Sequence, residues 1–387
     1  MLRPRCTHYE HYRLYTLGLF LHQAPHFNRS NAARRARHPH PGRSPTPFPI
    51  PEYQPPIPII KPPQNPNDGS KFILEATKTP LTLRHLLAHT SGLAYDATSD
   101  ELHPAWRDTL PSSNPRATSN LIFPNPMDIR MQFHTPLVFS PGEAGKWCYG
   151  SGLDWAGRVI ERANGEALSL GAYMEKYIFA PLGMRSATFR PTDKDRLIHR
   201  DDRDAETGAV VPGSTEGFAH VDVVDECGGS GLYVTAQDYA GVLEALLRDD
   251  GVLLSSEATG ELFRPQLADA EHPDVQAKLA EGQDVKAMLM DGGDRARVTW
   301  NHGLGGLVAL DNVPGKFRGG VMAASGMINS FWVSFEYFLA AEVAFRFLSS
   351  GLYNRSVSST ENGRRFWLAL VAGLGGTLLW APNLNPS

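Results

Sequence analysis

The chain has 387 residues, of which 42% are hydrophobic and 20% are charged. This composition can bury a hydrophobic core, and it excludes both a chain that is disordered throughout and a protein built from many membrane spans. The formal net charge of −4 makes nucleic acid an unexpected partner for the whole chain. We therefore expect one large α/β domain, either alone or with an arm.

The amino-terminal segment has a composition of its own. Residues 1–61 hold nine Lys and Arg against two acidic residues, a net charge of +7, which leaves −11 for residues 62–387. Eleven prolines lie between Pro41 and Pro66. Because proline fixes φ and lacks a backbone N–H, this stretch cannot continue a helix or join the interior of a sheet. We predict that residues 1–66 form a basic, Pro-rich arm that is disordered or polyproline-like.

Two further features bear on location. An Arg-rich, acid-poor amino terminus is also typical of organelle transit peptides, which is the alternative interpretation of the arm. The three cysteines Cys6, Cys148 and Cys227 are too few and too scattered for a disulfide framework or a zinc ribbon. They favour a reducing compartment, and we predict a cytoplasmic location.

The first elements after the arm are a strand and a helix. Residues 71–74 are typical of a strand. Residues 81–89 place apolar side chains at helical spacing, and Thr82 is a suitable N-cap. Gly92 is suited to a left-handed residue that ends this helix. Residues 97–130 are polar and rich in Pro and Asn, which indicates a long surface excursion.

Helical and strand patterns then follow one another. The spacing predicts an amphipathic helix over 153–163 and a second helix over 173–179. A third helix is expected to begin at Thr235 and to run through Leu247. Residues 298–310 and 319–323 have the pattern of strands in a sheet.

The carboxyl-terminal part holds an apolar run. Residues 366–381 are apolar except for glycines and one threonine. A membrane-spanning helix needs about 20 such residues, so this run is short for a span. A buried core helix is the favoured interpretation, and contact with a membrane through a tail anchor is the alternative.

Three kinds of chemistry are disfavoured by their motifs. His85 and His89 have the spacing of a zinc pair, but Leu86 stands where the glutamate of a metalloprotease would follow. Residues 228–231, Gly-Gly-Ser-Gly, lack the Lys-Ser/Thr ending of a phosphate loop. The chain has no Gly-x-Ser-x-Gly nucleophile elbow, which argues against an α/β-hydrolase triad. We expect neither a metal nor a cofactor.

The remaining candidate is Tyr149, which stands at the start of the helix expected over 153–163. A tyrosine can act as a general base when neighbouring cations lower its pKa from about 10. Taken alone, Tyr149-Gly150-Ser151 is a common turn. A catalytic role therefore needs support from other segments.

Further segments supply that support. Residues 81–93, with the sequence LTLRHLLAHTSGL, resemble the signature of β-lactamase-related serine hydrolases. This family includes class C β-lactamases, family VIII esterases and fungal acyltransferases of statin-type polyketide pathways. Trp147–Gly157 resembles the family's second motif and the helix after it. Phe179–Met184, Gly228–Tyr233 and Thr235–Tyr239 resemble segments that follow, and His302–Gly306 and Gly326–Asn329 resemble the region of the third motif.

The resemblance implies an α/β protein with a β-lactamase/transpeptidase-like fold. The expected architecture is an antiparallel sheet with flanking helices plus a mainly helical lobe, with the site between them and with the amino-terminal part incomplete. The related domain is expected over 67–332, followed by an atypical apolar segment over 333–387. The implied chemistry is acyl transfer, in which the serine of a Ser-x-x-Lys motif attacks a small ester, thioester or amide and backbone N–H groups hold the oxyanion.

The resemblance also assigns site residues. Tyr149 takes the base role, and we expect its hydroxyl to face the gap between the lobes. Ser151 stands where many relatives have asparagine. The other candidates for substrate contact are His302 and Gly303, and Ser325 and Gly326 at the third motif.

The chain departs from the family at its nucleophile. No serine stands three residues before any lysine, so Ser-x-x-Lys is absent from the sequence. Three hypotheses follow: a serine esterase or acyltransferase of fungal secondary metabolism that is inactive as written, a non-catalytic pseudoenzyme that binds a small acyl compound or a protein, and an incomplete translation of a gene whose product has the motif. An in-frame upstream exon encoding Ser-x-x-Lys would select the third. The substrate's identity and the oligomeric state stay open.

Overall fold

The computed structural model describes residues 10–12, 50–63, 71–96, 102, 106–118, 128–193, 197, 201–204, 206–212, 223–281, 298–313, 318–326 and 330–334. The helices are η2 Pro51–Tyr53, α2 Leu83–Leu87, η3 Arg107–Thr109, α3 Pro115–Thr118, α4 Ile129–Phe133, α5 Gly152–Ala163, α6 Leu170–Met174, the π-helix η4 Glu175–Phe179, α7 Ala180–Leu182, α8 Ala236–Arg248, α9 Ser256–Phe263 and α10 Pro273–Glu281. The strands are β1 Glu10–Tyr12, β2 Ile57–Lys61, β3 Ile73–Thr77, β4 Asp201–Arg203, β5 Val210–Pro212, β6 Leu232–Val234, β7 Trp300–His302, β8 Leu307–Ala309, β9 Met322–Gly326 and β10 Ser330–Ser334.

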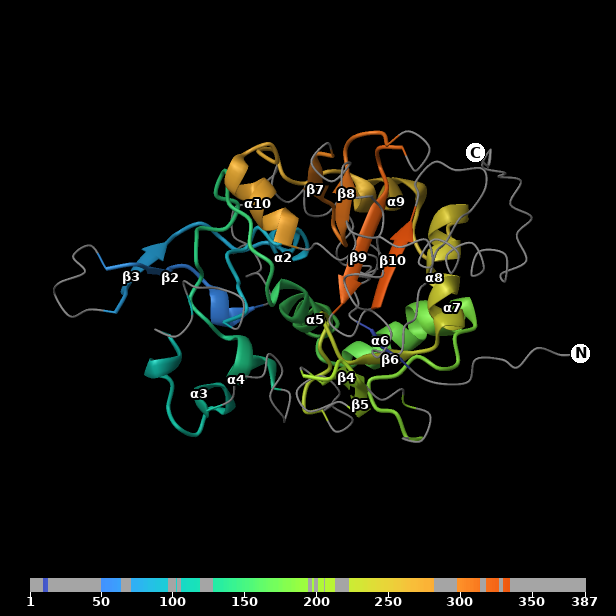
Figure 1. Ribbon diagram of the computed structural model, residues 1–387, viewed down its shortest axis with the longest axis horizontal. Helices are drawn as coiled ribbons and strands as arrows, with labels where there is room; N and C mark the ends of the chain where they lie inside the picture. Colours follow the sequence, from blue (N-terminus) through green and yellow to red (C-terminus); the bar gives the residue numbers. More distant parts are fainter. Residues whose placement is uncertain are drawn as a thin grey trace, which may run out of the picture.

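An antiparallel sheet organises one half of the molecule. Its strands follow the order β10-β9-β8-β7, and Val308 pairs with both Asn301 and Met322. In Figure 1 this sheet lies in the upper part beside α9 and α10, with α5, α6 and α7 below it. An antiparallel sheet with flanking helices and a separate helical group confirms the expected fold class.

The buried side chains form two main clusters, and both include strands of the sheet: Val308 and Met322 belong to the larger cluster, and Ala309 and Ala323 to the smaller. The larger cluster joins α5, α6, α8 and α9 to the segment 50–59. The smaller one lies on a face of the sheet, where Trp300 and Ala323 pack with Val275 and Leu279 of α10 and with Trp147. Tyr149 packs against both clusters. Tyr149 therefore lies where the two clusters come into contact.

The helix starts follow local capping signals. The Thr82 hydroxyl accepts a hydrogen bond from the His85 N–H at 3.2 Å, and Thr235 accepts one from the Asp238 N–H at 3.4 Å. These bonds satisfy amide groups that the first helical turn leaves unpaired. The end of α2 differs from the prediction, because the left-handed residue after it is His89, with φ of 56°. Gly92 is also left-handed but lies outside the helix end.

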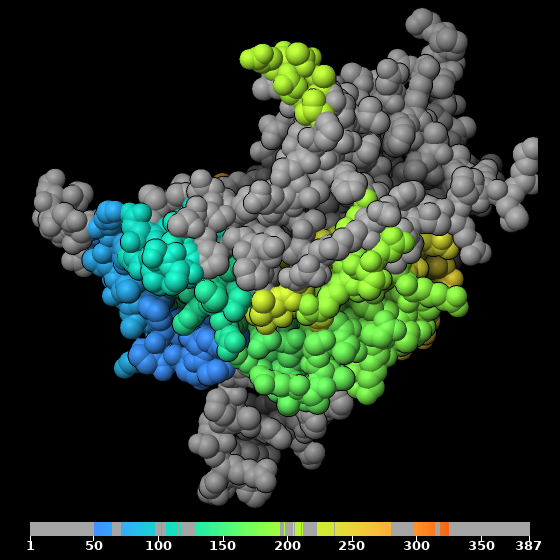
Figure 2. Space-filling model, turned by 90° about the horizontal axis from the view of Figure 1, so that it is seen from below, coloured from blue at the N-terminus to red at the C-terminus, as the bar shows by residue number. Residues whose placement is uncertain are grey.

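The expected arm over 1–66 is not separate from the core. Ile50, Tyr53 and Ile57 are each at most 2% exposed and belong to the larger core cluster. The Tyr53 hydroxyl donates to the Phe133 carbonyl at 3.0 Å. In this segment the prolines lie exposed while the isoleucines between them are buried, so an extended proline-containing chain can still supply core side chains. Figure 2 shows the blue residues of this segment continuous with the green ones that follow.

Two short strands, β1 and β2, also lie within the predicted arm. Residues Ile57–Lys61 form β2, which pairs antiparallel with β3, and the Pro58 carbonyl accepts a bond from the Leu137 N–H at 2.9 Å. β1 pairs antiparallel with β6. The prediction of a disordered or polyproline-like arm over 1–66 is therefore wrong for 10–12 and 50–61. Apart from Pro62 and Pro63, the rest of the arm lies outside the described residues.

The excursion over 97–130 is likewise anchored in the interior. Trp106 is 6% exposed, and the side chains of Arg107 and Arg116 are buried. The Asp96 carboxylate accepts from the Arg107 Nε at 2.8 Å and from the Arg116 Nε at 3.0 Å. Burial lowers the pKa of Arg116 to about 10, against the opposing influence of Tyr95. A buried ionic centre therefore ties this polar segment to the fold.

The described residues contain neither a membrane-spanning helix nor a metal-ligand cluster. Within those residues, no helix is long and apolar enough to cross a bilayer. No three His, Cys, Asp or Glu side chains of the described ranges come together as metal ligands. The apolar run 366–381 lies outside the described residues, so both interpretations of it stay predictions.

Candidate active site

Tyr149 lies in the segment that leads from Trp147 into α5. Its side chain is half-buried at the junction of the two core clusters. The direction of its hydroxyl stays a prediction.

Two glycines set the path of this segment. A Cβ on Gly150 would lie 2.1 Å from the Leu93 carbonyl oxygen, and one on Gly152 would lie 2.4 Å from the Leu86 carbonyl oxygen. No side chain fits at such distances, so the backbone on either side of Ser151 rests directly on α2 and on the residues after it. This close approach explains the small residues that flank Ser151.

Replacing Gly150 by alanine is expected to lower the free energy of unfolding by about 1–3 kcal/mol, the usual cost of overpacking. The colliding atom is a backbone carbonyl oxygen, which cannot rotate away. Chemical denaturation measures the effect. The matched control is Gly241→Ala within α8, where nothing lies within 4 Å of the added Cβ. There we expect a gain of about 0.5–1 kcal/mol, because alanine is the better helix former. Equal effects at the two positions would contradict this account.

Three rings from other parts of the chain, those of His89, Tyr95 and His302, lie against the Tyr149 segment, residues 147–152. The centroid of the His89 ring lies 4.8 Å from that of Tyr149, and the Tyr95 ring lies 5.6 Å from it. The His89 ring also contacts Trp147 at 5.9 Å and His302 at 5.2 Å, the latter edge to face. His89 therefore stands between the tyrosine and the sheet strand β7.

The two buried histidines carry neutral rings with different tautomers. The His302 Nδ1 lies 2.6 Å from the Gly303 carbonyl oxygen, so Nδ1 holds the proton. The His89 Nδ1 accepts from the Gly150 N–H at 3.4 Å, so its proton is on Nε2. Burial lowers the pKa of His302 to about 4, while the bond to Gly303 opposes that shift. Burial, and then the neighbouring His302, hold the pKa of His89 well below its usual range.

Ser151 is buried rather than available for reaction. It is 0% exposed, and among the residues that the structure describes its Oγ has no hydrogen-bond partner. It precedes α5 without capping it. Ser91 is 1% exposed, and its hydroxyl accepts from the Leu93 N–H at 3.2 Å. Neither motif serine is placed for attack on a substrate.

The sheet holds the other predicted site residues. Gly303 donates to the Gly306 carbonyl at 2.8 Å, and a Cβ on it would lie 2.6 Å from the Leu262 carbonyl oxygen. Ser325 and Gly326 end β9, paired with Phe331 and Ser330. The structure thus brings His302 to Tyr149 through His89. The side chains at the end of β9 lie outside what the structure describes, so their place relative to Tyr149 stays a prediction.

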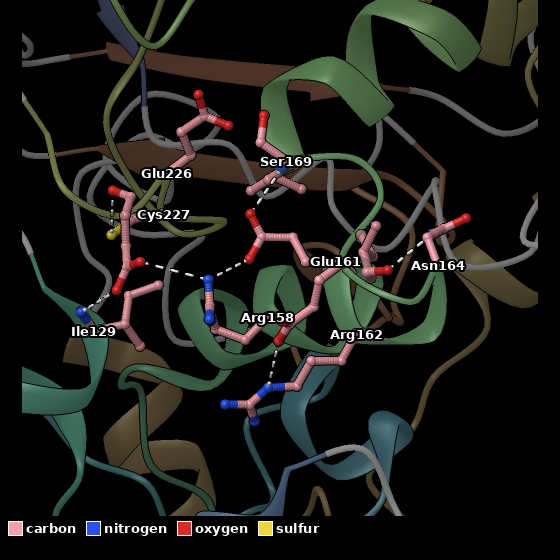
Figure 3. A network of polar contacts seen from close by, with 12 residues as sticks. Ile129, Arg158, Glu161, Arg162, Asn164, Ser169, Glu226 and Cys227 are labelled. Carbon is pink, nitrogen blue, oxygen red and sulfur yellow. Dashed lines mark hydrogen bonds and ion pairs between the residues drawn. The ribbon is translucent and has the colours of Figure 1, made fainter.

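A buried polar network holds α5, which carries the Tyr149 segment at its start. The Arg158 Nη1 lies 2.5 Å from Glu161 and 3.4 Å from Asp225, and the Asp225 carboxylate accepts from the Ile129 N–H at 2.9 Å (Figure 3). Asp154 accepts from the Tyr95 hydroxyl at 2.7 Å and from the Gly229 N–H at 3.0 Å. One amide of the Gly-rich bend thus binds a carboxylate of α5.

Sequence reasoning missed the roles of His89 and Tyr95. It considered His89 only as part of a helix and as half of a pair with the spacing of zinc ligands, and it drew nothing from Tyr95. The available signal was that both lie within or beside the segment 81–93, which resembles the family signature. Their contacts with Tyr149 join parts of the chain that are far apart, which no local pattern reveals.

Comparison with known proteins identifies the relationship. The family model described as Beta-lactamase matches residues 49–333. The chain belongs to the β-lactamase family.

Curated relatives and solved structures refine this assignment. The chain is 32% identical over 273 residues to monacolin J acid methylbutanoyltransferase of Aspergillus terreus, covering 69% of this chain and 62% of that protein. It is 32% identical over 259 residues to lovastatin esterase of Penicillium rubens, covering 65% and 60%. A mutant of simvastatin synthase from Aspergillus terreus superposes with a TM-score of 0.67 at 25% identity, covering 97% of this chain and 84% of that one. The chain spans about three fifths of the length of the two curated relatives.

These findings confirm the resemblance and the fold. The match over residues 49–333 includes the segment 50–61, in agreement with its burial in the core. The relatives include both acyltransferases and esterases. The roles of the individual site residues in this β-lactamase-family chain remain proposals.

Proposed function

We propose that this chain carries the substrate-binding half of an esterase or acyltransferase site for a small ester, thioester or amide, with Tyr149 as proton acceptor. As written, the chain is inactive. The observation that carries the proposal is the position of Tyr149, at the junction of the two core clusters and in the segment that resembles the second motif of the family. The names of the relatives support acyl chemistry on small molecules of fungal secondary metabolism.

The residues of the chain can fill some of the roles that acyl transfer requires. Acyl transfer needs a nucleophile, a group that takes its proton, and donors that hold the oxyanion. Tyr149 is our candidate for the second role. A Ser-x-x-Lys motif would supply the first and would place a cation near the phenol, but the sequence contains none. Of the residues expected to contact substrate, His302, Gly303 and Ser151 are buried. Ser325 and Gly326 stay the candidates for direct contact.

We expect the purified chain to form no stable acyl-enzyme. The test is incubation with a fluorophosphonate probe and with p-nitrophenyl butyrate. Loss of a nucleophile typically removes a factor of about 10⁴–10⁶ in rate and leaves only what binding and the oxyanion donors supply. We therefore expect no labelled serine, and at most a weak turnover that no single serine change abolishes. The first serines to examine are Ser91 and Ser151, and both are buried. Stoichiometric labelling of one serine, with turnover lost on its change to alanine, would refute this expectation.

A second experiment tests the enzyme proposal itself. A chain extended upstream by a segment with Ser-x-x-Lys should react with the probe at that serine. Tyr149→Phe in the extended chain should then lower turnover by about 10²–10⁴-fold, the usual worth of a general base. An extended chain that is folded and unreactive would overturn the assignment.

The second candidate function is a non-catalytic binding protein. The missing motif is the observation that favours it. It predicts that p-nitrophenyl butyrate binds, as seen by saturation-transfer NMR, and is not hydrolysed even after the extension. The enzyme would bind a small acyl compound, and the non-catalytic protein would bind a small acyl compound or a protein. A cytoplasmic location stays a prediction from the cysteine content.

A further inference from the structure

One residue, His89, contacts the Tyr149 segment at three successive positions. Its backbone carbonyl accepts from the Cys148 N–H at 3.2 Å. Its ring lies 4.8 Å from the ring of Tyr149. Its Nδ1 accepts from the Gly150 N–H at 3.4 Å. The residue before His89 adds a fourth contact, because the Ala88 carbonyl accepts from the Trp147 Nε1 at 3.0 Å.

The backbone of His89 is shaped for these contacts. With φ of 56° it lies in the left-handed region, which few residues other than glycine adopt and which histidine, asparagine and aspartate adopt more often than most. The helix α2 ends just before it, so the chain reverses direction here. This turn lets both the carbonyl and the ring of one residue reach the same neighbouring segment.

We propose that His89 is the positioning residue of Tyr149, which fixes the place of the phenol through the backbone on both sides of it and through its ring. The inference rests on the proposed role of Tyr149 as proton acceptor. A residue needed only to end α2 would require a positive φ and nothing more, and glycine would serve. The structure uses in addition an acceptor atom at the Nδ1 position and a flat ring.

The comparison of two variants separates positioning from helix termination. His89→Asn keeps a positive φ and offers its amide oxygen in the place of Nδ1. His89→Gly keeps the positive φ but has neither acceptor nor ring. Both variants preserve the helix end, and both should fold. They differ in the acceptor for the Gly150 amide, whereas each keeps the backbone carbonyl that binds Cys148.

The experiment is residue-resolved amide hydrogen exchange of the full chain, read at Gly150 and Cys148. We expect exchange at Gly150 to be about tenfold faster in His89→Gly than in the parent chain, the effect of one lost hydrogen bond. His89→Asn should restore protection at Gly150 to within about threefold of the parent. Amides of α8 serve as the reference for global opening. Equal exchange at Gly150 in all three chains would overturn the proposal, and so would a uniform rise that includes α8.

A second readout follows the phenol itself. Chains labelled with 3-fluorotyrosine report each tyrosine by ¹⁹F NMR, and Tyr149→Phe identifies the resonance of Tyr149. We expect this resonance to shift and broaden in His89→Gly, while the resonance of Tyr239, which lies in α8, stays in place. An unchanged Tyr149 signal would refute the positioning role. Neither readout needs catalysis, so a failure of the proposed enzyme function would leave this test intact.

Discussion

Replacement of Asp96 by alanine is expected to lower the free energy of unfolding by about 3–5 kcal/mol, the usual cost of leaving a buried charge without its partner. Asp96 is 4% exposed, and its carboxylate pairs with the guanidinium groups of both Arg107 and Arg116. The variant would leave both cations in the interior. Urea denaturation measures the change.

The matched control lies in the same part of the chain. Asp108 pairs with Lys71, and both of these side chains are about half exposed or more. Asp108→Ala should cost less than about 1 kcal/mol, because water screens exposed pairs. Asp96→Asn, which keeps an acceptor and removes the charge, should fall between the two. If Asp96→Ala cost no more than Asp108→Ala, the buried centre would not stabilise the fold.

Acid is expected to weaken the fold well before the carboxylates titrate. His302 has a pKa of about 4 in the folded chain, against about 6.5 for an unfolded histidine. Between these values the unfolded state binds the extra proton, so stability falls as the pH drops from 6.5 to 4, and this group causes no further loss below that. The shift corresponds to about 3 kcal/mol over the whole window. The lowered pKa of His89 acts in the same direction.

The measurement is the free energy of unfolding at pH 7 and pH 4.5, compared between the parent chain and His302→Gln. The difference between the two pH values should shrink by about 2–3 kcal/mol in the variant, because glutamine does not titrate. His272→Gln, at an exposed histidine, is the control and should leave the difference unchanged. A variant whose pH dependence equals that of the parent would show that His302 is not the cause.

The sequence by itself determined the features that depend on near neighbours. Thr82 and Thr235 cap helices because their hydroxyls reach an amide three residues on, and the helix expected over 153–163 needs only an apolar face. The family signature rests on contiguous motifs in the same way. The fold class, the family and the candidate Tyr149 could therefore be predicted from short stretches of residues alone.

Only the tertiary structure decided which polar and proline-rich segments are buried. Composition suggested an arm over 1–66 and a surface excursion over 97–130, because prolines and charges usually stay in water. The first supplies Ile50, Tyr53 and Ile57 to the core, with its prolines turned outward. The second pairs its arginines with Asp96. Whether such a segment is buried depends on the residues that the fold places against it. Composition does not say which residues those are.

The site shows the same division. Tyr149 could be chosen from its motif, but its neighbours could not, because His89 meets Gly150 across 61 positions of the chain and meets His302 across still more. The end of α2 and the strand β7 bring their histidine rings together only when the two core clusters pack against each other. The sequence specifies which groups are available for chemistry, and packing decides which of them touch, since contact energies between distant residues exist only in the folded chain.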